Sequence, residues 1–225
     1  MNRPVDERCP PSLVDRIVRE VFDSRLFALG FQRATRRKYV RRRIPHTYDV
    51  IELLSQTVSL RLIWGLSLDF VPHVQGRQTE TVQWHRTPRS ANPDLRYSEW
   101  DCMRGMRNRY TISTMHGEHV LREKALEASS VLLPHAFQLL DRVTDLAALR
   151  ELFLLKEKAP QWGWDIFNTP QVALAYAFYL AKMGHETQAG SYMSECLKRS
   201  HWRPETNERL TELFEDAIRR PLISQ

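Results

Sequence analysis

The sequence predicts an α+β fold: an N-terminal helix and an antiparallel meander sheet, a long loop, and an α-helical C-terminal half. Three observations support this prediction. Residues 13–28 form an amphipathic pattern, residues 58–70 carry an apolar side chain at every second position, and helical periodicity dominates from Glu118 onward.

The first helix is expected at residues 13–28. Ser12 and Asp15 resemble a capping box that follows two prolines, and a carboxylate suits the positive end of a helix. Apolar residues recur at helical spacing along one face, and Gly30 supplies a C-terminal stop.

Strand signals follow this helix. Residues 31–34 and 38–44 are short, extended and basic, and residues 48–56 are rich in apolar side chains. The period of two in residues 58–70 is typical of a strand with one buried face. Because the connections are short, we expect an antiparallel meander, which Pro72 ends.

For the rest of the chain, the sequence pattern predicts a loop followed by helices. Residues 73–110 lack a clean period, with a short helix as one option near residues 99–107, and a loop of this length is usually functional or disordered. The expected helices are 120–129, 133–143 restarted by Pro134, 145–156 capped by Thr144, one from Pro170 to Gly184, 186–198, and a last one from Pro204 to Pro221. The two helices on either side of Gly184 predict an ordinary helical hairpin rather than a repeat solenoid, because no second copy of the unit is present.

Charge divides the sequence into two predicted domains, residues 1–114 and 115–225. The first contains 20 Lys and Arg against 12 Asp and Glu, which gives +8, and the second contains 13 against 15, which gives −2. The second region is a helical domain or a helical layer on the first. Because positive surfaces attract acidic proteins and nucleic acids alike, the asymmetry indicates a partner for the N-terminal region.

Composition narrows the class of protein. Hydrophobic residues make up 42% and charged residues 27%, as in soluble globular proteins. The longest apolar stretches fall short of a membrane span, and the first residues lack the apolar core of a signal peptide. Cys9, Cys102 and Cys196 have neither a disulfide nor a metal-site spacing, so we expect reduced thiols and a cytoplasmic protein.

No catalytic or cofactor motif is recognisable. The sequence has no clustered glycines for a phosphate loop, no nucleophile elbow and no zinc-protease pair, so it predicts no catalytic residue, cofactor or metal. Asp49, Glu52 and Asp69 lie on predicted strands, where they are interpreted as cross-strand ion-pair partners, with a general base as the alternative.

The strongest functional signal is a basic segment with seven cations in eleven residues: Arg33, Arg36, Arg37, Lys38, Arg41, Arg42 and Arg43. One interpretation is an edge strand that is charged to prevent aggregation. The other is a docking face for an anionic partner. On a strand, Arg41 and Arg43 would share one face and project outward.

The predicted loop interleaves arginines with aromatic residues. This composition suits protein-interface hot spots and equally suits single-stranded nucleic acid, whose bases stack on rings. The predicted partner-binding residues are Arg36, Arg37, Arg41, Arg43, Arg86, Arg89, Arg96, Tyr97 and Trp100.

The order of these features resembles a bacterial family known as domain of unknown function 4304. The resemblance lies in helix 13–28, the phrase Leu29-Gly30-Phe31, the basic strand with Tyr39 and Arg41, and the strand pair 49–56 and 58–70. It covers the N-terminal half of the chain, and its motifs set a fold rather than a catalytic site. It implies an immunity-type or accessory protein of bacterial toxin and defence systems, which acts by binding protein.

These observations together predict a non-enzymatic protein that binds a macromolecule. We expect an acidic protein partner, a bacterial toxin or effector, to be neutralised by occlusion, with no membrane association. Two alternatives stay open at this point. One is an RNA- or single-stranded-DNA-binding module, and the other is an enzyme whose site lies between the sheet and the helices.

Overall fold

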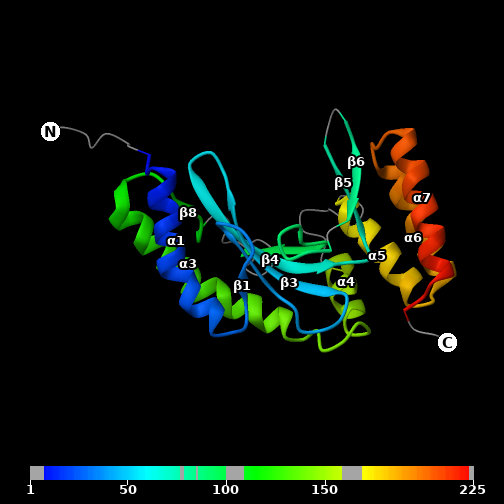
Figure 1. Cartoon of the computed structure of the whole chain (residues 1–225), viewed down its shortest axis with the longest axis horizontal. Coiled ribbons are helices and arrows are strands. Elements are labelled where there is room, and N and C mark those ends of the chain that lie inside the picture. Colours follow the sequence, from blue (N-terminus) through cyan, green and yellow to red (C-terminus); the bar gives the residue numbers. More distant parts are fainter. Residues whose placement is uncertain (1–7, 77–78, 85, 100–108, 159–168, 223–225) are drawn as a thin grey trace. The chain divides into compact units, whose positions relative to one another are not determined.

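The computed structural model describes residues 8–76, 79–84, 86–99, 109–158 and 169–222, and it confirms the predicted α+β class (Figure 1). The chain forms two compact units, each made of segments that alternate along the sequence with those of the other. The first unit comprises Met1–Arg43, Tyr48–Leu66 and Arg96–Val143, and the second comprises Ile44–Thr47, Ser67–Leu95 and Thr144–Gln225. This division differs from the predicted boundary after residue 114, because both units take segments from either side of it.

Helix α1 (Pro11–Phe27) opens the first unit. Its N-cap is Pro10 with no side-chain cap, so the predicted capping box is wrong: Ser12 lies inside the helix, and the Asp15 carboxylate accepts a hydrogen bond from Arg37 instead. Proline is tolerated in the first helical turn because the missing N–H would have no intrahelical acceptor. The predicted stop is confirmed, since Gly30 takes a φ of +81° that favours glycine.

A six-stranded sheet packs with α1. Its strands are β1 (Gln32–Arg33), β2 (Lys38–Arg41), β3 (Thr47–Ser55), β4 (Ser59–Leu68), β7 (Leu95–Ser98) and β8 (Ile112–Ser113). The order is β1-β2-β3-β4-β7, and β8 pairs with β4. In the antiparallel β2–β3 register Arg41 lies opposite Asp49. Strand β7 falls inside the predicted loop and β8 lies just after it, since both are too short to show a period.

Strand β4 is more buried than its alternation predicts. Ile63 and Ser67, which alternate with the apolar positions, are 2% and 0% exposed. The prediction of one buried face is therefore wrong for most of this strand. Alternating polar residues allow one face of a strand to be solvated, but another element can cover and bury that face as well.

Helix α3 (Gly117–Leu140) is a single helix, so the predicted interruption at Pro134 is wrong. Proline removes one backbone hydrogen bond, whereas the buried side chains on either side of it, Leu133 and Ala136, favour continued packing. Helices α1 and α3 lie side by side in Figure 1, and ion pairs such as Arg16–Glu118 join them.

Within its described residues, the second unit combines a hairpin with four helices. The hairpin consists of β5 (Pro72–Gln75) and β6 (Thr81–Trp84), and the helices are α4 (Leu149–Lys158), α5 (Pro170–Lys182), α6 (Glu186–Arg199) and α7 (Pro204–Arg219). Pro72 thus begins a strand instead of ending the sheet region, contrary to prediction. The expected helical hairpin is confirmed, because α5 packs against α6, and α5 is buried from Val172 to Ala181.

A buried carboxylate organises the interior of this unit. Asp94 is 0% exposed and accepts the backbone N–H of Leu68 at 2.7 Å and the Gln171 amide at 3.0 Å. His73 Nε2 lies 2.7 Å from the same carboxylate. Asp94 therefore connects three segments of the second unit through its two oxygens, which is how a buried charge is tolerated.

Glu80, which lies in the connection between β5 and β6, caps the N-terminus of α7. Its carboxylate accepts the backbone N–H of Arg203, the N-cap residue, at 2.9 Å. That hydrogen bond, together with one from Thr206, holds the pKa of Glu80 below its usual value. A carboxylate here also complements the positive end of the helix dipole.

We expect Glu80→Gln to lower the thermal unfolding midpoint at about pH 7. Because the folded-state pKa of Glu80 is lowered, its stabilising effect is present above the unfolded-state pKa and is lost as the pH falls, so the difference from wild type should shrink by about pH 3. Glu208→Gln, at an exposed position on α7, is the matched control. Circular dichroism melts at both pH values measure this, and an unchanged difference would contradict the capping role.

Candidate binding site

The basic segment binds several carboxylates, of which Asp49 on β3 is the most buried. Its side chain is 3% exposed, and it accepts hydrogen bonds from Arg41 Nε at 2.9 Å and from Arg43 Nε at 2.7 Å. Arg41 also binds Asp141, just after α3, at 2.8 Å. Two guanidinium groups around one buried carboxylate compensate the loss of hydration of all three charges.

Arg43 extends this cluster to the C-terminal end of α3. Its guanidinium donates to the backbone carbonyls of Leu140 and Val143. The last carbonyls of a helix lack intrahelical donors and carry partial negative charge, so a cation there satisfies and stabilises them. The interpretation of Asp49 as an ion-pair partner is confirmed.

The expectation that Arg41 and Arg43 project outward as a docking face therefore requires correction. The Arg41 side chain is 11% exposed and the Arg43 side chain 25%, and both bind groups of their own unit. Nor is β2 an edge strand, because β1 pairs with its outer side. The physical reason is the cross-strand position of Asp49, which accepts hydrogen bonds from both cations.

Asp15 on α1 is another carboxylate that the basic segment binds. Arg37 Nε donates to it at 2.7 Å, and Arg37 also binds the hydroxyl of Ser55 at 2.9 Å. Arg36 reaches the other oxygen of Asp15 at only 3.6 Å, and its side chain is 87% exposed. Arg37 thus has a structural role between helix and sheet, whereas Arg36 keeps most of its surface in solvent.

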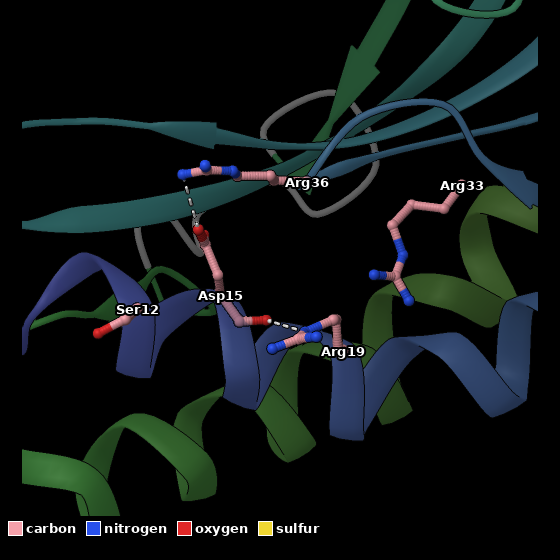
Figure 2. A pocket seen from close by; sticks show the side chains of 5 residues that line it. All are labelled: Ser12, Asp15, Arg19, Arg33 and Arg36. Atoms are coloured by element: carbon pink, nitrogen blue, oxygen red, sulfur yellow. Dashed lines mark hydrogen bonds and ion pairs between the residues drawn. The ribbon is translucent and has the colours of Figure 1, made fainter.

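A hollow of about 340 Å³ opens between α1 and the β1–β2 connection, lined by Ser12, Asp15, Arg19, Arg33 and Arg36 (Figure 2). A second hollow, of about 430 Å³, shares Arg19 and Arg33 with the first and adds Arg16, Glu20 and Asp23. We name the two adjoining hollows together the arginine groove. In Figure 2, Asp15 extends from α1 toward Arg36, and Arg19 lies one turn further along the helix.

Hydrogen bonds fix the walls of the arginine groove. Arg19 Nε donates to the backbone carbonyl of Asp15 at 3.3 Å, so a neutral acceptor holds this cation. Arg33 pairs with Asp23, whose other oxygen accepts the hydroxyl of Tyr39 at 2.8 Å. Burial, together with the hydrogen bond to Asp23, raises the pKa of the fully buried Tyr39 well above its usual value, so the phenol stays a donor.

The charge balance of the first hollow and its supports is positive. Four guanidinium groups, those of Arg19, Arg33, Arg36 and Arg37, surround the two carboxylates of Asp15 and Asp23. An anion that enters the hollow would meet Arg36, whose side chain is 87% exposed, and Arg19, which is exposed on α1. This arrangement can bind a carboxylate or a phosphate group through charge-assisted hydrogen bonds.

The remaining predicted partner-binding residues are not among those that line the arginine groove. Arg86 and Arg89 are exposed in the second unit, with the Arg86 guanidinium 4.5 Å from the centre of the Trp84 ring. Arg96 is exposed on β7. Tyr97 is 5% exposed, so its predicted role as a surface anchor is wrong. Trp100 lies outside the described residues, and so do residues 100–107 of the optional helix near residues 99–107.

Other chemistry receives little support from the described ranges. Cys9 and Cys196 are buried free thiols, and burial raises the pKa of Cys196 to about 12, so it is a poor nucleophile at neutral pH. Within those ranges, no three His, Cys, Asp or Glu side chains gather to bind a metal. The helices that the structure describes include none with the length and apolar character needed to cross a bilayer.

Sequence reasoning missed Arg19, Asp15 and Asp23 as parts of the site. A signal was present, because these residues follow one another at intervals of four on the predicted helix and so share one face. Their role in the site depends on which strand packs beside that face of the helix, and the sequence does not show this.

We expect Asp49→Asn to lower the free energy of unfolding by about 3–5 kcal/mol, because it leaves two guanidinium groups around a neutral side chain. Asp141→Asn is the matched control, since this partner of Arg41 is 56% exposed and should contribute about 1 kcal/mol or less. Urea unfolding of both variants measures the difference. Equal losses would contradict the structural role of Asp49.

No protein-family model, no curated protein and no solved structure matches this chain. The resemblance to domain of unknown function 4304 stays a prediction.

Proposed function

We propose that this protein is a non-enzymatic binding protein that recognises an acidic protein through the arginine groove. It acts as an immunity-type protein, which neutralises a bacterial toxin or effector by covering its active surface. The observation that carries this proposal is the excess of guanidinium groups over carboxylates between α1 and the β1–β2 connection, with Arg36 87% exposed.

Electrostatics give this surface its role in recognition. A concave surface lined by cations concentrates field and speeds the encounter with an acidic partner. Asp23 holds Arg33 and Asp15 holds Arg37, so the walls beside Arg19 and Arg36 are already ordered before a partner binds. Recognition by the groove would thus combine fast association with fixed geometry.

The lining of the groove favours binding over catalysis. Asp15, the carboxylate of the first hollow, is engaged by Arg37 and faces Arg36, so it is poorly placed to accept a proton from a substrate. Arginine itself stays protonated and seldom transfers protons. We place this activity in the cytoplasm, where buried free thiols stay reduced.

Nucleic-acid binding is the competing function, since phosphates also bind arginine. Single-stranded nucleic acid additionally needs exposed rings on which bases stack. Of the predicted aromatic residues, Tyr97 is buried and Trp84 already carries Arg86 over its ring. These positions favour a protein partner.

The test is capture of partners from the source cell with wild-type protein, an Arg19→Glu/Arg36→Glu double variant, and Arg209→Glu. Arg209, on α7, is a matched exposed arginine outside the groove. We expect an acidic protein to be retained by wild type and Arg209→Glu and to be depleted about tenfold or more by the double reversal. Co-expression with wild type should rescue growth from that protein if it is toxic.

Two outcomes would overturn the proposal. One is an identical set of captured proteins for all three forms. The other is depletion of RNA or DNA instead of protein, with purified affinity for an oligonucleotide that falls steeply as salt rises, because such a slope reports phosphate neutralisation.

A further inference from the structure

Two large apolar side chains are exposed just beyond the arginine groove. Phe27, the last residue of α1, is 46% exposed, and Leu29 is 42% exposed. Arg33 links Phe27 to the groove, because it lines both hollows and its guanidinium carbon lies 5.9 Å from the centre of the Phe27 ring. A cationic site and an apolar site therefore lie along the same helix.

The framework under Phe27 is rigid. Its ring lies 6.4 Å from that of Tyr39, which is fully buried and hydrogen-bonded to Asp23. Asp23 in turn pairs with Arg33. The apolar site and the groove wall thus share one supporting network, so their separation is fixed.

Helix geometry sets this separation. Arg19 and Phe27 are eight positions apart on α1, and at about 1.5 Å per residue this corresponds to about 12 Å along the axis. An extended chain advances about 3.3 Å per residue, so it covers the same distance in about four residues.

We propose that the groove and Phe27 together form a two-point site for an extended acidic segment of the partner. One carboxylate of that segment enters the first hollow between Arg19 and Arg36, and an apolar side chain about four residues away covers Phe27. This inference rests on the proposed function and specifies the partner's binding segment.

Asp15 shows within the molecule how a carboxylate binds here. Arg37 contacts one of its oxygens at 2.7 Å, and Arg36 approaches the other at 3.6 Å. Arg36 is therefore not held in close contact and can turn toward an incoming carboxylate. Arg–carboxylate pairs and apolar contact with an aromatic ring are the combination that dominates interface hot spots.

The experiment titrates the full protein into three fluorescent peptides of equal length and net charge. The first places two Asp residues and a Phe about four positions apart, the second places them adjacent, and the third replaces Phe by Ser. We expect tightest binding of the first peptide. Arg36→Gln and Phe27→Ser should each weaken it by about tenfold, because each removes one of the two contacts.

The variants are chosen to keep the fold, since both side chains are exposed. Arg209→Gln and Leu155→Ser are the controls, as exposed positions on α7 and α4 that should leave binding unchanged. Circular dichroism confirms folding in each case.

The outcomes separate this inference from the proposed function. Binding that depends on charge alone, without effect of spacing or of Phe27→Ser, overturns the two-point site but leaves the groove as a docking surface. Absence of binding to every peptide also overturns it. The proposed function fails on its own test, if capture of the whole partner is insensitive to the double reversal of Arg19 and Arg36 or if nucleic acid is depleted instead of protein.

Discussion

The first unit depends on one buried carboxylate. Asp49 lies opposite Arg41 in the β2–β3 register, and it binds both Arg41 and Arg43. Since Arg43 also donates to the carbonyl of Leu140, the last residue of α3, and to that of Val143 just beyond it, the same cluster connects two strands to the end of a long helix. Removing this one acceptor would leave cations without compensation in a partly dehydrated environment.

This constraint explains why only some arginines of the first unit stay open to solvent. Where a carboxylate from the same unit is within reach, the guanidinium group becomes part of the framework, as for Arg37, Arg41 and Arg43. Where the nearest acceptor is a neutral carbonyl or a more distant carboxylate, as for Arg19 and Arg36, the cation stays open to solvent. The number of basic residues in the sequence therefore overestimates the cationic surface that is open to a partner.

Much of the fold could be predicted, because its longer elements show clear periods. The helix ending before Gly30, the strand pair beginning at Thr47 and the helices on either side of Gly184 follow from apolar spacing and glycine placement. Strands β5 to β8 could not be predicted, since elements of two to four residues show no period and form only through pairing. Pro134 likewise predicted a break that tertiary packing overrides.

The candidate site was only partly predictable for a related reason. The sequence identifies Arg36 as part of a basic segment, but its value as a contact depends on Asp15 and Arg19 from another element. Tyr97 shows the reverse case, in which a residue typical of interfaces packs inside instead. Composition indicates which residues are suited to binding, whereas only the packed structure shows which of them remain exposed.

The most direct test of this account is nuclear magnetic resonance of the arginine Nε–H groups. The Arg37, Arg41 and Arg43 signals should exchange slowly with water and stay unchanged when an acidic ligand is added, because carboxylates of the same unit hold them. The Arg36 signal should exchange fast and shift on titration. Fast exchange of Arg41 and Arg43, or shifts confined to them, would contradict the account.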